Sequence, residues 1–255
     1  MYSQMPTDTI SALLELNHKF YQDFGSAFAA TRRRIQPGIH RLLEEMPAGG
    51  GWLDIGCGSG TLAAAWAAKQ PHGDYLGLDF SASLLEEARK TIAKTDQASA
   101  AQIKFIQTDL GDPDWPDQLE GRSFNGIMAF AVLHHLPGRQ TRQRLMRQIR
   151  SFLKPGGLFY HSEWQFQHSP RLMARRQPWK MAGIDPEHIE PGDTLLDWRH
   201  ALPGQAEKIG LRYVHLFDLD ELNELAFNAG FKITHTFESD GREGRLGLYQ
   251  VWQAC

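Results

Sequence analysis

The sequence is poor in cysteine and carries no excess of positive charge. Cys57 and Cys255 are the only cysteines among its 255 residues. Two thiols so far apart exclude a disulfide framework and lack the spacing of a metal site, so we expect neither a disulfide nor a metal. The formal net charge is −3. Binding of nucleic acid would therefore depend on a local basic patch.

Long apolar runs are also missing. No stretch approaches the ~18 uninterrupted apolar residues of a membrane-spanning helix. The first residues show no basic region followed by an apolar run, so we expect no secretory signal. These absences predict a cytoplasmic protein without a membrane partner. The hydrophobic share of 42% and the charged share of 22% are ordinary for a globular chain, whose length suffices for one large domain with an inserted cap.

Short apolar runs alternate with helical patterns in the middle of the chain. Strands are expected at 50–55, 75–79, 103–107, 124–130 and 157–161, and helices at 61–69, 81–89 and 139–153. This order predicts a parallel sheet with helices on both faces. Ligands of such sheets bind beyond the carboxyl ends of the strands, where the strand order reverses.

The C-terminal part predicts the end of the same sheet. A helical pattern covers 219–229, and two strand-like runs at 231–237 and 246–252 follow it. Their short, turn-rich connection predicts an antiparallel pair. Residues 164–210 hold five prolines and three tryptophans and interrupt the alternation, which favours a substrate-side insertion.

We therefore expect four parts. Two helical patterns near the N-terminus, at 9–24 and 35–46, contribute to the cap. The expected parts are residues 1–47 as N-terminal helices of the cap, 48–163 as the cofactor-binding core, 164–210 as the cap insertion and 211–255 as the C-terminal part of the core sheet.

A glycine-rich loop joins the first expected core strand to the helix after it. Gly56, Gly58 and Gly60 permit a tight turn and let a ligand approach the backbone, and the helix start adds unpaired N–H groups. Such a loop suits a dinucleotide pyrophosphate or the carboxypropyl end of S-adenosylmethionine (SAM). Its spacing lacks the third glycine of the dinucleotide fingerprint. A purely structural turn is the other interpretation.

Three aspartates at the ends of successive strands bear on this choice. Asp54 precedes the loop, where it would repel a pyrophosphate and favour the amino group of SAM. Asp79 can accept both ribose hydroxyls, which also fits a nicotinamide cofactor, and Asp109 can accept a hydrogen bond from an adenine amino group. Phe80 and Leu110 can enclose the adenine or simply pack in the core. Each aspartate alone is more often a turn residue, but together they favour SAM.

These motifs resemble those of the class I SAM-dependent methyltransferases. The resemblance runs through residues 53–60, 77–79, 108–110, 131–136 and 153–157. It implies a Rossmann-like α/β fold, with a seven-stranded sheet whose last strand is antiparallel, and SAM as cofactor. The residues expected to contact the cofactor are Asp54, Gly56, Cys57, Gly58, Gly60, Asp79, Phe80, Asp109, Leu110 and Phe130.

Two histidines follow the fourth expected core strand, at the ligand edge of the sheet. A catalytic base is one interpretation of His134 and His135. For His135 we favour the other, a packing and helix-start motif common to this superfamily. His134 is expected to contact the cofactor or the acceptor.

Two flanking segments, 21–34 and 211–217, resemble those of a narrower family, the tRNA wobble-uridine carboxymethyl methyltransferases. Gln36 stands before Pro37, where that family usually has an aromatic residue. The resemblance implies methylation of the carboxylate of a modified wobble uridine in tRNA.

A carboxylate acceptor requires no general base, because it is already ionised at neutral pH. Transfer then depends on in-line positioning and exclusion of water. A hydroxyl or phenol acceptor would instead need His134, Glu163 or His215 as a base. The candidate residues for handling the acceptor are Arg32, Tyr21, His134, Trp164, Tyr213 and His215.

Two basic clusters are candidates for binding RNA phosphates. One is the triplet Arg32, Arg33 and Arg34, whose side chains suit a two-bond grip on an anion. The other is residues 139–154, with six basic and no acidic residues, where a solvated helix face is the favoured interpretation. The competing functions are a small-molecule O-, N- or C-methyltransferase with an enclosed pocket, and a non-catalytic SAM-fold partner protein.

Overall fold

The computed structural model describes residues 4–30, 34–69, 72–95, 102–200 and 207–255. Its helices are α1 (Thr7–Ala30), α2 (Pro37–Glu45), α3 (Thr61–Lys69), α4 (Ala82–Ile92), α6 (Arg139–Phe152), α7 (Pro170–Met173) and α8 (Leu219–Asn228). Its strands are β1 (Gly50–Ile55), β2 (Gly73–Asp79), β3 (Ile103–Gln107), β4 (Phe124–Phe130), β5 (Leu153–Trp164), β6 (Arg176–Gln177), β7 (Asp193–His200), β8 (Lys208–His215), β9 (Phe231–Ser239) and β10 (Gly247–Ala254).

Seven strands form the main sheet in the order β3-β2-β1-β4-β5-β10-β9. The first five strands of this order pair in parallel, and β10 is antiparallel to both β5 and β9. The expected Rossmann-like sheet with an antiparallel last strand is therefore confirmed. The strand order reverses between β1 and β4, so the carboxyl ends of these two strands mark the place for a ligand.

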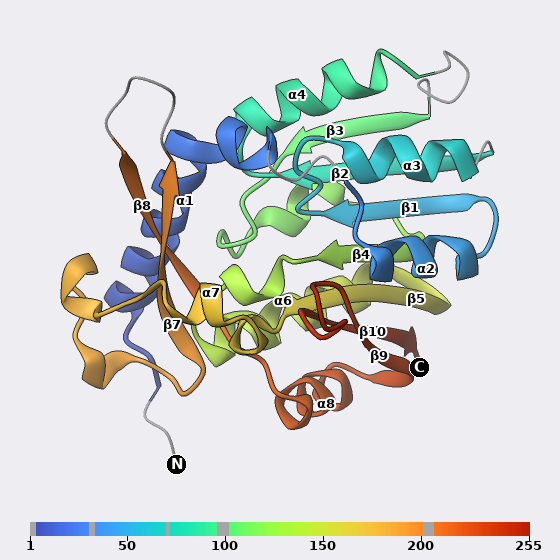
Figure 1. Ribbon diagram of the computed structural model, residues 1–255. Coiled ribbons are helices and arrows are strands. Elements are labelled where there is room, and N and C mark those ends of the chain that lie inside the picture. The colour runs from blue at the N-terminus through green and yellow to red at the C-terminus, as the bar shows by residue number, and fades with distance from the viewer. Residues whose placement is uncertain (1–3, 31–33, 70–71, 96–101, 201–206) are drawn as a thin grey trace.

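Helices cover both faces of this sheet, α2, α3 and α4 on one side and α6 and α8 on the other (Figure 1). Alternation along β1 explains how it serves two layers. Leu53 packs into the apolar cluster that includes the buried face of α6, whereas Trp52 packs with residues of α2 and α3. A strand that is buried on both faces is mostly apolar, as β1 is apart from Asp54 near its carboxyl end.

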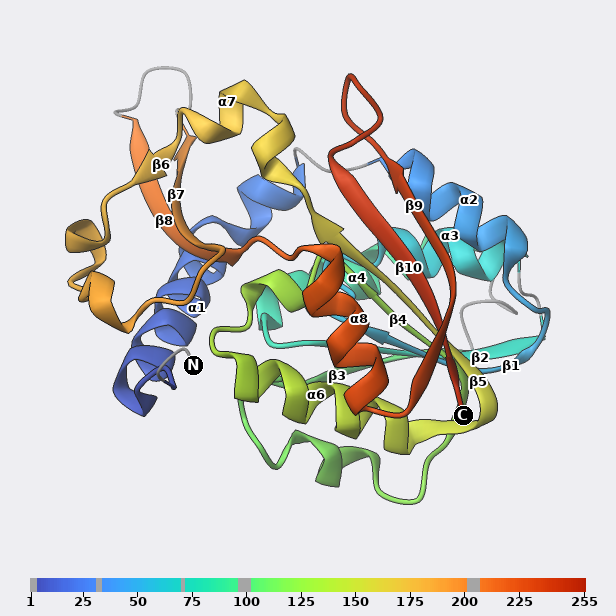
Figure 2. The same ribbon diagram turned by 90° about the horizontal axis from the view of Figure 1, so that it is seen from below.

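A second, three-stranded antiparallel sheet, β6-β7-β8, lies beyond the carboxyl ends of the core strands. Helix α1 packs against β8, and together they stand beside the main sheet (Figures 1 and 2). The expected division at residue 211 is wrong, because it cuts through β8, which belongs to the small sheet and not to the core sheet. The strands β6 and β7 were not predicted from the sequence, because the prolines in 164–210 are not typical of strands.

Within the described ranges, no helix combines the length and the apolar character needed to span a bilayer.

Candidate functional site

The glycine loop between β1 and α3 has the shape that its sequence requires. Gly56, Gly58 and Gly60 have φ angles of 74°, 55° and 76°, a region that favours glycine. A Cβ atom at Gly60 would lie 2.9 Å from the backbone of Ala88, so that glycine permits close packing with α4. A Cβ atom at Gly58 would meet nothing within 4 Å, which leaves room for a ligand against the backbone.

Asp54, at the carboxyl end of β1, is buried and accepts a hydrogen bond from the hydroxyl of Tyr75. Burial raises the pKa of Asp54 to about 7, and the nearby carboxylate of Asp79 adds to this effect. A cationic ligand group would stabilise the ionised form of this carboxyl. The amino group of SAM has that charge.

Asp79, at the end of β2, is held by two backbone donors. The N–H groups of Gly58 and Ser81 donate to its two oxygens, each at 2.9 Å. Burial nevertheless raises the pKa of this carboxyl. Asp79 lines the cavity next to the loop, where it can accept hydroxyl donors with its remaining lone pairs.

Asp109 follows β3 and pairs with a residue of α1. Its Oδ1 accepts from the N–H of Gly111 at 2.8 Å, and its Oδ2 lies 3.3 Å from Nε2 of His18. Burial opposes the charged form of Asp109, but the hydrogen bonds from His18 and Gly111 outweigh it and lower the pKa. The His18 ring also lies 4.6 Å from the Phe80 ring, so α1 meets the expected adenine region at two points.

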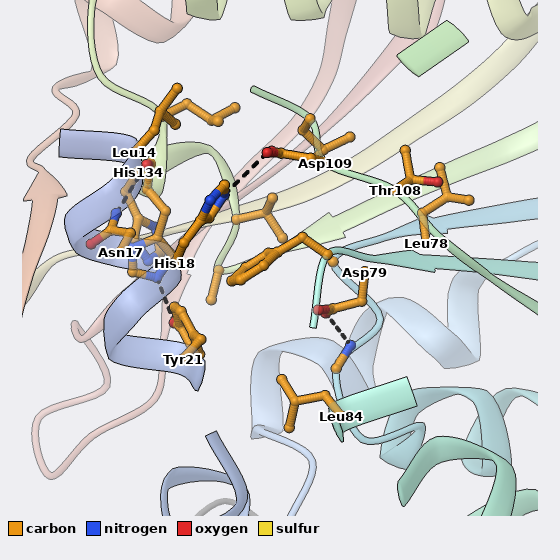
Figure 3. A pocket seen from close by; sticks show the side chains of 18 of the residues that line it. Leu14, Asn17, His18, Tyr21, Leu78, Asp79, Leu84, Thr108, Asp109 and His134 are labelled. Atoms are coloured by element: carbon orange, nitrogen blue, oxygen red, sulfur yellow. Dashed lines mark hydrogen bonds and ion pairs between the residues drawn. The ribbon is translucent and has the colours of Figure 1, made fainter. Parts of the chain in front are cut away.

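The glycine loop, Asp79 and Asp109 surround a cavity of about 230 Å³, which we call the inner cavity (Figure 3). Helix α1 forms one of its walls, and the glycine loop and the ends of the core strands form the others. Its lining includes Leu14, Asn17, His18, Tyr21, Gly56, Gly58, Asp79, Phe80, Leu84, Asp109, Leu110, Phe130, His134, His135, Trp164 and Arg212. The backbone donors, the carboxylates of Asp79 and Asp109 and the apolar walls fit the ribose and the adenine of SAM.

A second and larger cavity, of about 1050 Å³, adjoins the inner one, and we call it the outer cavity. The two share wall residues, among them Phe130, Trp164 and Arg212. Asp54 and Cys57 border the outer cavity rather than the inner one. Six arginines line the outer cavity: Arg34, Arg171, Arg175, Arg199, Arg212 and Arg242.

Comparison with known proteins agrees with this geometry. The family profile described as a methyltransferase domain matches residues 53–159. A SAM-dependent methyltransferase from Methanosarcina mazei has the same fold, with a TM-score of 0.60 at 22% identity over 86% of this chain and 98% of its own. The glycopeptide N-methyltransferase MtfA in complex with SAM matches with a TM-score of 0.61 at 15% identity, over 86% of each chain.

Among sequence relatives, a protein of Encephalitozoon cuniculi named as a methyltransferase is 28% identical over 85% of this chain and 87% of its own length. The tRNA (carboxymethyluridine(34)-5-O)-methyltransferase of Schizosaccharomyces pombe is 24% identical over 89% of this chain and 93% of its own length. The Arabidopsis thaliana protein of the same name is 24% identical over 70% of this chain, which spans only 40% of that relative.

The chain is a SAM-dependent methyltransferase. SAM is its cofactor, and it supplies an electrophilic methyl group when bound. Of the residues expected at the cofactor, Gly60 does not line either cavity in the described part of the chain, and its contribution is the packing described above.

The structure brings some of the expected acceptor residues together and separates others. Tyr21, His134 and Trp164 all line the inner cavity of the methyltransferase. The hydroxyl of Tyr21 lies 3.0 Å from Nε2 of His135, whose Nδ1 faces the carbonyl oxygen of Tyr213 at 3.3 Å. His135 thus joins α1 to β8, in keeping with the packing role favoured for it. Arg32 lies outside the described residues.

Tyr213 and His215, which were expected to handle the acceptor, lie apart from the two cavities. As far as the chain is described, neither lines the inner or the outer cavity. Both are buried and bond Asp193, through the Tyr213 hydroxyl and His215 Nδ1 at 2.7 Å each. Alternation along β8 is the physical reason, because residues 213 and 215 point to the face opposite to Arg212.

Arg212 is the functional candidate that the sequence-based list omitted. Its side chain is only 3% exposed, and its guanidinium carbon lies 4.7 Å from the ring centroid of Trp164 and 5.5 Å from that of Phe20. It borders both cavities. Its position beside Tyr213 in the flanking segment was the available signal, and strand alternation would have identified it.

Around His215 the methyltransferase holds one group of possible metal ligands among its described residues, Glu190, Asp193 and His215. Arg142 already pairs with Glu190 at 2.7 Å, and Tyr213 with Asp193. His215 bridges Asp193 and Glu221, whose Oε2 is 2.8 Å from its Nε2. The cationic Arg142 disfavours a metal ion here, and the group acts as an ionic joint between α6, α8 and the cap.

Proposed function

We propose that this methyltransferase transfers the methyl group of SAM to a carboxylate carried by RNA, namely the carboxymethyl group of a wobble uridine in tRNA. The observation that carries this proposal is the position of Arg212. A buried guanidinium at the wall between the two cavities suits a carboxylate that must reach the cofactor from the outer cavity, because arginine matches carboxylates with two parallel bonds.

The outer cavity supports an RNA acceptor. Arg34, Arg171 and Arg242 are exposed along it, where they suit the phosphates on either side of an inserted nucleotide. Arg175 and Arg199 instead pair with Asp197, at 3.2 and 3.0 Å. The named functions of the fission-yeast and Arabidopsis relatives point in the same direction.

A methyl acceptor of this kind needs orientation rather than proton removal. Arg212 would hold the carboxylate, and Trp164 would pack against the acceptor at the shared wall. Phe130 and Trp164 would keep water from the reacting oxygen. The cofactor residues would be Asp54, Asp79 and Asp109 with the backbone of Gly58.

The small-molecule alternative predicts an enclosed, largely apolar pocket beneath the tryptophans of the cap. Trp164 and Trp198 instead border the arginine-lined outer cavity, and Trp179 packs in a separate cluster with Tyr213. The larger cavity therefore favours a polyanionic acceptor over an apolar metabolite.

The test is a labelled-SAM assay with two synthetic anticodon stem-loops, one with 5-carboxymethyluridine at the wobble position and one with unmodified uridine. We expect a base-labile methyl ester on the first and no transfer to the second. Methylation of components of a metabolite extract, with none of the modified stem-loop or of a tRNA pool, would refute the proposal.

The role of Arg212 has its own test. Arg212→Gln should lower kcat/KM for the modified stem-loop by at least about 30-fold, the lower end of the cost of removing one partner of a buried charge pair. SAM affinity should change little. Arg212→Lys keeps the charge but not the two-bond geometry, so its kcat/KM should lie between those of the parent protein and of Arg212→Gln. Equal activity of all three proteins would remove Arg212 from the site.

A further inference from the structure

Three buried side chains form a hydrogen-bonded chain at the junction of the two cavities, where His134 lines the inner cavity and Glu163 the outer one. His161 and Glu163 project from the same face of β5, and His134 comes from the turn after β4. Nδ1 of His161 lies 3.2 Å from Oε1 of Glu163, and Nδ1 of His134 lies 3.1 Å from its Oε2. None of the three side chains is more than 2% exposed. The methyl transfer proposed above does not use Glu163 or His161.

A neighbouring backbone donor decides which atoms of these three side chains donate and which accept. The backbone N–H of Trp164 points to Nδ1 of His134 at 3.4 Å. An N–H group can only donate, so this Nδ1 accepts and the ring proton of His134 sits on Nε2. With no proton on Nδ1, the hydrogen of the contact between His134 and Glu163 comes from a protonated Glu163. Nδ1 then shares its lone pair between the Trp164 N–H and the Glu163 hydroxyl, and Glu163 is a neutral carboxylic acid.

The surroundings favour the same assignment. Burial raises the pKa of Glu163 well above its usual range, although a backbone N–H from His134 and the charge of Arg142 act against this. Burial also lowers the pKa of His161 to about 3. Nε2 of His161 has no hydrogen-bond partner among the described residues, which suits an unprotonated nitrogen and excludes a charged ring. His161 therefore donates from Nδ1, and the whole chain is uncharged.

We propose that neutral Glu163 is a positioning residue that fixes His134 as an N–H donor toward the inner cavity. His134 then orients an anionic acceptor oxygen and does not act as a base. This second step of the proposal, the orientation of the acceptor oxygen, deepens the proposed function and rests on it, because an ionised carboxylate needs no base whereas a hydroxyl acceptor would. The first step concerns this chain alone.

The first step is tested by nitrogen NMR of the histidine side chains in the full-length protein without acceptor. The His134 ring, assigned by its loss in His134→Gln, should show a proton on Nε2 and a bare Nδ1. A proton on Nδ1, or on both nitrogens, would overturn the proposal. This readout does not depend on which acceptor the enzyme methylates, so it separates failure of this inference from failure of the proposed function.

A pair of variants tests the second step. The amide of glutamine can donate an N–H to His134 and accept from His161 with its carbonyl oxygen, as the hydroxyl and carbonyl of the neutral acid do. Glu163→Gln should therefore keep the proton of His134 on Nε2 and a kcat close to that of the parent. Glu163→Ala removes the constraint and should lower kcat by about 10²-fold, the cost of losing one oriented donor, with little change in KM for SAM. If Glu163→Gln lost as much activity as Glu163→Ala, an ionised Glu163 supporting a base would be correct and the proposal would be wrong.

Discussion

The ionic joint around Arg142 and the outer cavity both concentrate arginine and carboxylate groups, but they use them differently. In the joint, Arg142 is 2% exposed and its Nη2 lies 2.7 Å from Glu190 and 3.0 Å from Glu221. In the outer cavity, Arg34, Arg171 and Arg242 are exposed to the space that a ligand would fill. The charges of the joint therefore neutralise one another within the protein, whereas several arginines of the outer cavity are placed to bind an anionic partner.

Arginines that are close in sequence therefore need not share a function. On α6, Arg139 pairs with Glu224, Arg144 donates to the carbonyl oxygen of Gly111, and Arg150 donates to those of Gly230 and Cys255. These contacts tie α6 to its neighbours and leave little of the phosphate-binding surface that was the alternative interpretation of this helix. The arginines of the outer cavity come instead from separate segments that only the fold brings together.

Breaking the joint should have the largest effect. Arg142→Met would leave two partly buried carboxylates, Glu190 and Glu221, without their buried cation. The cost should be about 3 kcal/mol in the free energy of unfolding, the lower end of the range for breaking a buried pair. Chemical denaturation followed by circular dichroism measures this change. Arg139→Met, on the same helix, is the matched control: its pair with Glu224 is about half exposed, so the loss should be about 0–1 kcal/mol. Similar losses in the two variants would contradict the contrast.

A substitution of Asp79 tests whether the carboxylates that face the inner cavity bind SAM. Asp79→Ala should weaken SAM binding by about 1–3 kcal/mol, because the ribose would lose its buried acceptors, and titration calorimetry measures the change. Asp74→Ala, at the exposed start of the same strand, should leave the affinity unchanged. An unaltered affinity in Asp79→Ala would exclude the proposed ribose contact.

The carboxylates of the joint and of the cavities also differ in their pKa values, which predicts a pH dependence of SAM binding. The pKa of Glu221 is lowered because His215 and Arg142 outweigh its burial, whereas burial raises the pKa of Asp54 to about 7. If Asp54 receives the amino group of SAM, binding must remove its proton. Affinity should then rise with pH by at most about tenfold per unit, or 1.4 kcal/mol, up to about pH 7 and level off above it.

The control for this prediction is Asp54→Asn, in which the pH dependence of SAM affinity should vanish. In the protein without SAM, the sign is the opposite. The folded state holds the Asp54 proton more tightly than the unfolded state, so the stability that this proton contributes is lost as pH rises through about 7. A parent protein whose SAM affinity is flat between pH 6 and 7.5 would show that Asp54 does not meet the amino group.

The sequence predicted the core well because its signals are local. The alternation of strands and helices, the glycine loop and the antiparallel final pair all follow from short-range patterns. The N-terminal helices were expected in the cap, but the contact of α1 with the cofactor residue Asp109 was not foreseen, since His18 pairs with Asp109 across 91 positions of the chain. Likewise, Tyr213 and His215 were placed at the acceptor because the flanking motif was treated as a unit, although a strand sends successive residues to opposite faces.

The smallest expected effect is a change in the salt dependence of RNA binding, which distinguishes the arginines of the outer cavity from those of α6. Arg171, on α7, borders the outer cavity, whereas Arg147 is exposed on α6 and lines neither the inner nor the outer cavity in the described part of the chain. If RNA lies in the outer cavity, Arg171→Ala should reduce the slope of log affinity against log salt by about 0.7–1, the share of one phosphate contact. Arg147→Ala should leave that slope unchanged. Fluorescence anisotropy of a labelled stem-loop at several salt concentrations measures both. A reduced slope for Arg147→Ala alone would move the RNA to α6, and it would return to that helix the phosphate-binding role that its internal contacts argue against.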